Sequence, residues 1–166
     1  IADIVLQLLS YVAETERRNI RQRQAEGIRA ARKRGAALGR NLVNGIFKGH
    51  IPLREEFLAA HGLTYEEIIR RVYREPYANR FLASFAPFVH AYLDCPEVRA
   101  MVAETFADFA QRNLSRYPVH LTVACIGGVA AAFEGLLREV LAQGGYRVGR
   151  IAASPAEGLI EYHYGK

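Results

Sequence analysis

The sequence predicts a helix-rich α/β domain preceded by a long basic helix. Two apolar runs rich in β-branched residues, 119–126 and 146–152, have the composition of strands. A helical stretch lies between them, so we expect a β-α-β unit with parallel strands and a right-handed crossover. Most of the remaining chain shows helical periodicity. The first 40 residues hold nine Lys or Arg against four Asp or Glu, whereas the remainder holds thirteen of each.

The composition is that of an ordinary globular domain. The chain has 166 residues, of which 51% are hydrophobic and 23% charged. No apolar run approaches the roughly 20 residues that a membrane helix needs, so no membrane partner is expected. The chain begins at Ile1 without Met or a signal-peptide pattern, which predicts that residue 1 is not a natural start.

The cysteines and histidines give no sign of a metal site. Cys95 and Cys125 belong to no CxxC pair, and the five histidines show no ligand spacing. Buried small hydrophobes are the favoured interpretation of the two thiols, which fits a cytoplasmic location.

The first predicted helix covers residues 3–34. Ile4, Leu8 and Val12 form one apolar stripe, and the segment after Val12 is mostly charged. Gly35 is the predicted stop of this helix. We expect the N-terminal part of such a helix to pack against other apolar residues. Its C-terminal part should be exposed to solvent or bound by a partner.

The middle of the chain predicts further helices. Residues 35–49 indicate a glycine-punctuated turn and a short helix. Thr64 and Glu67 form a capping box at the start of the next helix. Two more helices are predicted over 77–94 and 97–116. Aromatic residues at helical spacing in the first of these are expected in the core: Phe81, Phe85, Phe88 and Tyr92.

A strand, a glycine pair and a helix follow. The run 119–126 predicts a buried strand, ended by Gly127-Gly128, and residues 129–143 predict a helix. Glycines let a ligand approach the backbone, and a helix N-terminus offers N–H groups to a phosphate or a polar ring. Taken alone, such a turn is equally well a tight connection. After the second strand, Ser154-Pro155 should open a last helix that runs to about residue 161.

Five short motifs follow one another in a fixed order. They are GAALGR (35–40), YREPYANRFLASF (73–85), YPV (117–119), IGGVA (126–130) and SPAEGL (154–159). In this set and order, the stretch from Gly35 to His163 resembles the C-terminal part of the BadF/BadG/BcrA/BcrD ATPase family, which includes N-acetylglucosamine kinases.

The resemblance implies an actin-like, ribonuclease-H-like fold that binds ATP and Mg²⁺ in a cleft between two lobes. It places the glycine pair against the adenosine, which implicates four residues: Gly127, Gly128, Val129 and Ala130. Asn79 and Arg80, in the second motif, are interpreted as a surface or hinge pair. The Gly-rich hairpin with its Asp, and the acid that accepts the sugar hydroxyl proton, have no counterpart here. Residues 35–166 are thus expected to form an incomplete ATPase lobe with no catalytic residue and no metal ligand of its own.

The basic helix has a resemblance of its own. With the spacing AExERxxIxxRxxEG at its centre, residues 4–40 resemble the long oligomerisation helix of serine recombinases, the resolvases and invertases. In that family the arginines matching Arg17 and Arg23 help to hold DNA phosphate, although Gln22 departs from the usual Glu. A solvated amphipathic helix is the alternative interpretation. The segment 35–40 suits both families, so a join of two sources at this point is a further hypothesis.

Three functions follow as expectations. The first is a nucleotide-binding C-terminal fragment of an ATP-dependent sugar kinase or ATPase, inactive alone, whose full-length parent binds a sugar. The second is a DNA-binding and oligomerisation fragment of a serine site-specific recombinase, and the third is an interaction protein that dimerises through the apolar stripe. Two parallel strands leave an edge unpaired, so marginal stability or homo-oligomerisation is expected.

Overall fold

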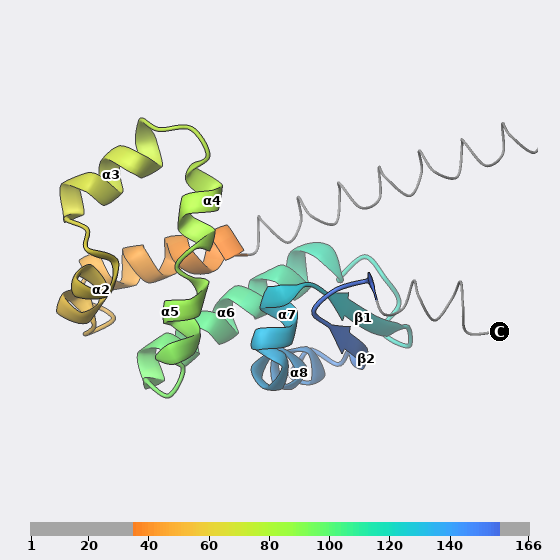
Figure 1. Cartoon of the computed structure of the whole chain (residues 1–166). Helices are drawn as coiled ribbons and strands as arrows, with labels where there is room; N and C mark the ends of the chain where they lie inside the picture. Colours follow the sequence, from red (N-terminus) through yellow and green to blue (C-terminus); the bar gives the residue numbers. More distant parts are fainter. Residues whose placement is uncertain (1–34, 157–166) are drawn as a thin grey trace, which may run out of the picture.

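The computed structural model describes residues 35–156 as a set of helices joined to a small parallel sheet (Figure 1). Residues 35–47 are helical and are called helix 35–47 below. The later elements are α2 (Arg54–His61), α3 (Tyr65–Tyr73), α4 (Ala78–Ala83), α5 (Ala86–Ala91), α6 (Pro96–Asn113), β1 (Thr122–Ile126), α7 (Gly128–Ala132), α8 (Glu134–Gln143) and β2 (Arg147–Ala152). The helix-rich α/β class is confirmed. The predicted helix over residues 3–34 lies outside the described residues.

Gly35 does not end a helix, contrary to the prediction. It is buried and helical, and a methyl group built on it would lie 3.1 Å from the Cβ of Ala83. One turn later, a methyl group on Gly39 would collide with the carbonyl oxygen of Leu82. The two glycines therefore let helix 35–47 lie directly against α4, and their role is close packing rather than capping.

The predicted single helix over 77–94 is divided into α4 and α5. Pro87 occupies the first turn of α5, where its missing N–H costs nothing. Within a continuous helix the same ring would clash with the carbonyl of Ala83. The short helix α2 was not predicted at all, because Phe57 is its only buried residue and its apolar pattern is correspondingly weak.

The predicted helix over 129–143 is also divided, with Phe133 between α7 and α8 at φ −106°. The buried ring of Phe133 packs edge-on against His90 at 5.3 Å and Phe106 at 6.1 Å between ring centroids. We attribute the break to the burial of this ring between α5 and α6. The helix over 97–116 is confirmed as α6, and the cap at Thr64 is confirmed as a complete capping box.

Within residues 35–156 the sheet has two strands, and they are parallel as predicted. Thr122 pairs with Arg147 and Ile126 with Ala152, with one irregularity in register between Val123 and Cys125. The first strand is shorter than the predicted 119–126, because Pro118 accepts a hydrogen bond from the N–H of Leu121 at 3.1 Å and so forms a turn.

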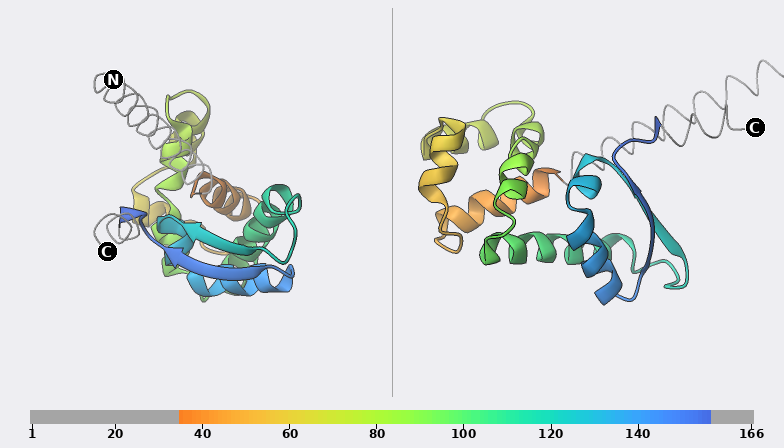
Figure 2. Two further views of the ribbon diagram at one scale, coloured as in Figure 1. Left: turned by 90° about the vertical axis from the view of Figure 1, so that its right-hand side faces the viewer. Right: turned by 60° about the horizontal axis from the view of Figure 1, so that its bottom comes forward.

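The prediction that the first strand is buried is wrong for the described part of the chain. Only Cys125 of β1 is buried, and Ile126 is 52% exposed. Figure 2 shows α7 and α8 on one side of the two strands, and the other side carries no described element. The core lies among the helices and extends beneath this inner face of the sheet.

Candidate functional site

The glycine turn between β1 and α7 is fixed by backbone hydrogen bonds on both sides. The N–H of Gly127 donates to the carbonyl oxygen of Ala152 in β2 at 2.8 Å, and its own carbonyl accepts from Ala131 of α7 at 3.0 Å. Gly127 has φ 138° and ψ 155°, a conformation that is open essentially to glycine alone. This residue therefore shapes the turn, and its N–H is not available to a ligand.

Gly128 presents an open backbone surface. It is exposed, and a methyl group built on it would meet no atom within 4 Å. The N–H groups of Gly128, Val129 and Ala130 have no hydrogen-bond partner in the described range 35–156. They are the first N–H groups of α7 and point their partial positive charge out of the helix start.

The side chains of Val129 and Ala130 face the interior. Ala130 is 4% exposed, and Val129 is half-buried against the core. A methyl group on Gly35 would lie 3.8 Å from Cγ2 of Val129 as well as close to Ala83. Three of the five sequence motifs, those containing Gly35, Ala83 and Val129, thus meet at one point although they are far apart in the chain.

The other predicted site residues do not join this turn in the described structure. Arg17 and Arg23 lie outside the described residues. Asn79 and Arg80 are exposed, in agreement with their interpretation as surface residues. Phe85 and Phe88 are buried, and Phe81 and Tyr92 pack against the core, as predicted.

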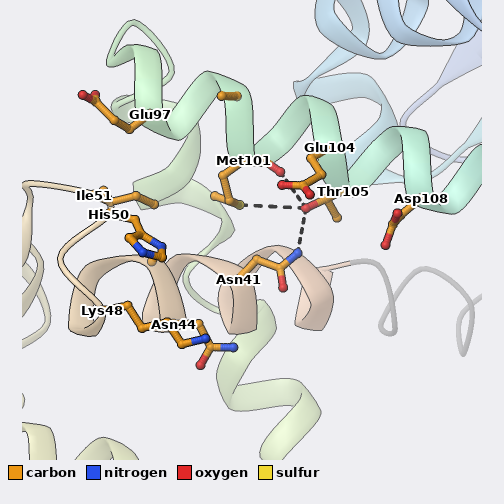
Figure 3. Close-up of a pocket in the computed structure, with 12 residues that line it drawn as sticks. Asn41, Asn44, Lys48, His50, Ile51, Glu97, Met101, Glu104, Thr105 and Asp108 are labelled. Carbon is orange, nitrogen blue, oxygen red and sulfur yellow. Dashed lines mark hydrogen bonds between the residues drawn. The ribbon is translucent and has the colours of Figure 1, made fainter.

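A second polar site, which the sequence did not predict, is a groove of about 530 Å³ between helix 35–47 and α6 (Figure 3). Asn41, Asn44 and Lys48 line one wall with helical spacing, and the opposite wall is formed by α6. The α6 wall carries Glu97, Glu104, Thr105 and Asp108, again with helical spacing. The helical spacing of these polar residues could have been recognised in the sequence. The packing of the two helices side by side could not have been predicted, since Asn41 and Thr105 are 64 residues apart.

One hydrogen bond joins the two walls of the groove. Asn41 Nδ2 donates to Thr105 Oγ1 at 2.9 Å, and Thr105 Oγ1 donates to the carbonyl of Met101 at 2.8 Å. At the end of the α6 wall, the Cys95 thiol donates to Glu97 at 3.0 Å, and this bond lowers the pKa of the Glu97 carboxyl. Glu97 is therefore a carboxylate at neutral pH.

Within residues 35–156, no group of three His, Cys, Asp or Glu side chains is placed to hold a metal ion. Cys125 is buried as predicted, whereas Cys95 is only half-buried, and the two form no disulfide. No helix in this range is long and apolar enough to cross a membrane.

Comparison with known proteins gives two different similarities. The family "Resolvase, N terminal domain" matches residues 1–37. No curated protein matches the chain. Among solved structures, a protein from Porphyromonas gingivalis that carries the assignment N-acetylglucosamine kinase is 43% identical, with a TM-score of 0.77. The match covers 80% of this chain and 48% of that protein, so the chain spans about half of its length. The chain therefore has a sugar-kinase-like fold over most of its length and a resolvase-like segment at its start.

Proposed function

We propose that this chain is the nucleotide-binding, C-terminal part of an ATP-dependent sugar kinase or related ATPase, with residues 35–166 as its kinase-like portion. The observation that carries the proposal is the 43% identity, over 80% of the chain, to a protein assigned as an N-acetylglucosamine kinase. By this proposal adenine nucleotide is the ligand of the chain. A sugar of the N-acetylglucosamine type is the substrate of the full-length parent, and the absence of a disulfide between Cys95 and Cys125 fits a cytoplasmic protein.

The convergence of the motifs supports a ligand site at the glycine turn. Gly35, Ala83 and Val129 come from three of the motifs that resemble the ATPase family, and they lie together next to the glycine pair 127–128. Gly35 packs closely against Ala83 of α4, and Val129, which directly follows the glycine pair, lies in ordinary contact beside it. A rigid turn suits a ligand that is recognised by backbone atoms.

The chemistry of the turn fits an adenine nucleotide. The open surface of Gly128 leaves room for a flat ring or a ribose to lie against the backbone. The unpaired N–H groups of Gly128, Val129 and Ala130 can donate to ring nitrogens, hydroxyls or phosphate oxygens. Gly127 contributes only the shape of the turn, because its N–H is already bonded to Ala152.

The residues of the described range do not fit Mg²⁺, and we derive no catalytic step for this chain. No three-ligand cluster is present there. In this proposal the Mg²⁺ ligands and the acid that takes the sugar hydroxyl proton belong to the other half of the kinase-like fold, and the chain alone is inactive.

Titration of a fluorescent ATP analogue against the chain tests the proposal. Gly128→Val places a branched side chain in the space that the ligand would occupy, and we expect affinity to fall at least about tenfold, or about 1.4 kcal/mol. Gly135→Val is the matched control, because a methyl group on Gly135 of α8 also meets no atom within 4 Å. Equal binding by the two variants and the wild type would remove the glycine turn from the proposal. Absence of saturable binding to the wild-type chain would overturn it.

The second candidate is a DNA-binding and oligomerisation fragment of a serine site-specific recombinase. The resolvase family match to residues 1–37 favours it for that segment alone. Arg17 and Arg23 are the proposed phosphate contacts. Because phosphate contacts release counterions, DNA binding should weaken steeply as salt rises.

Fluorescence anisotropy with duplex DNA distinguishes this candidate. We expect the double variant Arg17→Gln, Arg23→Gln to reduce the slope of log K against log salt by about two. Arg70→Gln and Arg74→Gln, two exposed arginines in and just after α3, form the matched control. Binding that survives deletion of residues 1–34 would exclude this segment as the DNA-binding element.

A further inference from the structure

We propose that the connection between α3 and α4 is a docking site for an acidic, partly apolar peptide segment of another protein. The site, called the tyrosine–arginine patch below, consists of four exposed residues: Tyr73, Arg74, Tyr77 and Arg80. Figure 1 and Figure 2 show this connection at the outer end of the helical part, away from the sheet. The inference uses no residue of the glycine turn and is independent of the nucleotide proposal.

The two rings of the patch are left uncovered by the described chain. Tyr77 is 80% exposed and Tyr73 is 78% exposed, and they are the most exposed large hydrophobic side chains of residues 35–156. Their Cα atoms are at most about 14 Å apart, because only three residues separate them. A single exposed ring is ordinary, but two on one short connection are typical of a contact surface, where tyrosine is enriched.

The backbone of Tyr77 costs stability that its exposed ring does not restore. With φ 65° and ψ 30°, Tyr77 is the only residue other than glycine with a positive φ in the described range. A side chain in this left-handed region is unfavourable, whereas glycine adopts it freely. The conformation is held by the Tyr77 carbonyl, which accepts from the N–H groups of Arg80 at 2.8 Å and Phe81 at 3.2 Å. Because such strain is concentrated at functional sites, we attribute the tyrosine at this position to contact with a partner.

The patch lies in a basic stretch of an otherwise neutral part of the chain. Residues 70–80 hold four arginines and one glutamate, a net charge of +3, whereas residues 41–166 as a whole hold thirteen basic and thirteen acidic residues. A local excess of positive charge attracts an anionic partner.

Two of the four arginines remain available to that partner. Arg70 pairs with Glu75 at 3.4 Å, and Arg71 lies 5.3 Å from the centre of an aromatic ring of α4. Arg74 and Arg80 make neither an ion pair nor a side-chain hydrogen bond within residues 35–156. Their guanidinium groups can therefore donate to the carboxylates of a partner.

This combination favours an acidic peptide over a nucleic acid. Carboxylates of the peptide pair with the two free guanidinium groups, and apolar side chains between them cover the two rings. A nucleic acid carries a phosphate on every nucleotide, and its backbone would meet the carboxylate of Glu75 in the middle of the patch.

Amide chemical shifts measured by NMR on the whole chain test the proposal. The probe is a short peptide of aspartate, leucine and glycine in repeating order, and the control peptide has lysine in place of aspartate. We expect the acidic peptide alone to give saturable shifts confined to residues 70–80, and these should weaken as salt rises. The double variant Arg74→Gln, Arg80→Gln should weaken binding at least about fivefold. Arg116→Gln with Arg147→Gln, at two exposed arginines elsewhere, should leave it unchanged.

The variant Tyr77→Gly separates recognition from folding. Because glycine adopts φ 65° freely, this variant should keep or raise the midpoint of urea unfolding while weakening the acidic peptide at least about fivefold. A lowered midpoint would show that the ring is structural and would overturn the proposal. Shifts that are absent or spread over the whole surface would also overturn it, as would unchanged binding in both patch variants. Tighter binding of an oligothymidylate with the same number of charges would assign the patch to nucleic acid instead.

Discussion

The helical part of the chain, residues 35–113, and the β-α-β part, residues 122–152, solve the burial of apolar side chains differently. In the helical part, Phe57 is fully buried and its ring lies 4.9 Å from Phe85 and 5.3 Å from Phe88, edge to face. In the β-α-β part, the helices cover one face of the sheet, and Ile126 on the other face is half-exposed.

The difference shows that an apolar segment is buried only where another helix or strand packs against it. In the helical part, both partners of an aromatic contact are present, since Phe57 comes from α2 and Phe88 from α5. Parallel sheets are normally covered on both faces, and the apolar sequence of β1 has the composition for that environment. Among residues 35–156, however, only the inner face of β1 has neighbours that bury it.

The largest expected effect comes from the aromatic cluster of the helical part. Phe57→Ala removes a fully buried ring and leaves a cavity, so we expect the free energy of unfolding to fall by about 3–5 kcal/mol. Urea denaturation followed by circular dichroism measures it. Tyr73→Ala, at a ring that is 78% exposed, should change it by less than about 0.5 kcal/mol. Equal losses in the two variants would contradict the view that stability is concentrated in this cluster.

A smaller effect is expected at the turn that joins the sheet to its helices. Gly127→Ala forces a side chain into a backbone conformation at φ 138°, which should cost about 1–3 kcal/mol. Gly128→Ala has no such strain and open space around its new methyl group, so unfolding should change by less than about 0.5 kcal/mol. The same denaturation experiment compares them. A tolerated Gly127→Ala would show that the hydrogen bond to Ala152 does not hold the turn in this shape.

Local signals in the sequence predicted most of the local structure. The capping box at Thr64, the parallel pairing of two strands and the glycine turn depend on residues close in sequence or on a strand-helix-strand order. The break before Pro87 was also visible in the sequence, but the aromatic spacing across it favoured one continuous helix. Helix α2 has a single buried residue, so its periodicity carried little information.

Features that depend on distant segments could not be predicted. The groove exists because helix 35–47 and α6 lie side by side, and neither helix alone indicates the other. The packing of Gly35 against Ala83 and Val129 has the same origin. A glycine that ends a helix and a glycine that lets another helix approach have the same local sequence, and only the fold distinguishes them.

A further prediction concerns the capping box of α3, which is local to the helical part. The Glu67 N–H donates to Thr64 Oγ1 at 3.3 Å, and the Thr64 N–H donates to the Glu67 carboxylate at 2.9 Å. Thr64→Ala should therefore cost about 1 kcal/mol. The backbone bond from Thr64 lowers the pKa of Glu67 below its ordinary value of 4.5.

The lowered pKa of Glu67 fixes the sign of the pH dependence. The carboxylate is favoured in the folded state, so its contribution is present above the unfolded pKa and is lost as pH falls through the folded pKa. Glu67→Gln should be destabilising at pH 7, and the difference from the wild type should disappear at acid pH. Glu66→Gln, on the same turn but outside the capping box, is the control. A difference between Glu67→Gln and the wild type that does not depend on pH would argue against the ionised cap.

The smallest effect on stability, and a separate effect on association, is expected on the outer face of the sheet. Thr122, Ala124 and Ile126 of β1 are exposed there, and the chain carries no charge between His120 and Glu134 to discourage pairing of this strand with a second copy. We expect the wild-type chain to self-associate in a concentration-dependent manner in analytical ultracentrifugation. Ile126→Lys should weaken this association while changing the free energy of unfolding by less than about 0.5 kcal/mol. Ala107→Lys adds the same charge at an exposed position of α6 and should not weaken it. A wild-type chain that stays monomeric at all concentrations would show that the exposed face of β1 is tolerated without a partner. The difference in burial between the two parts of the molecule would then have no effect on self-association.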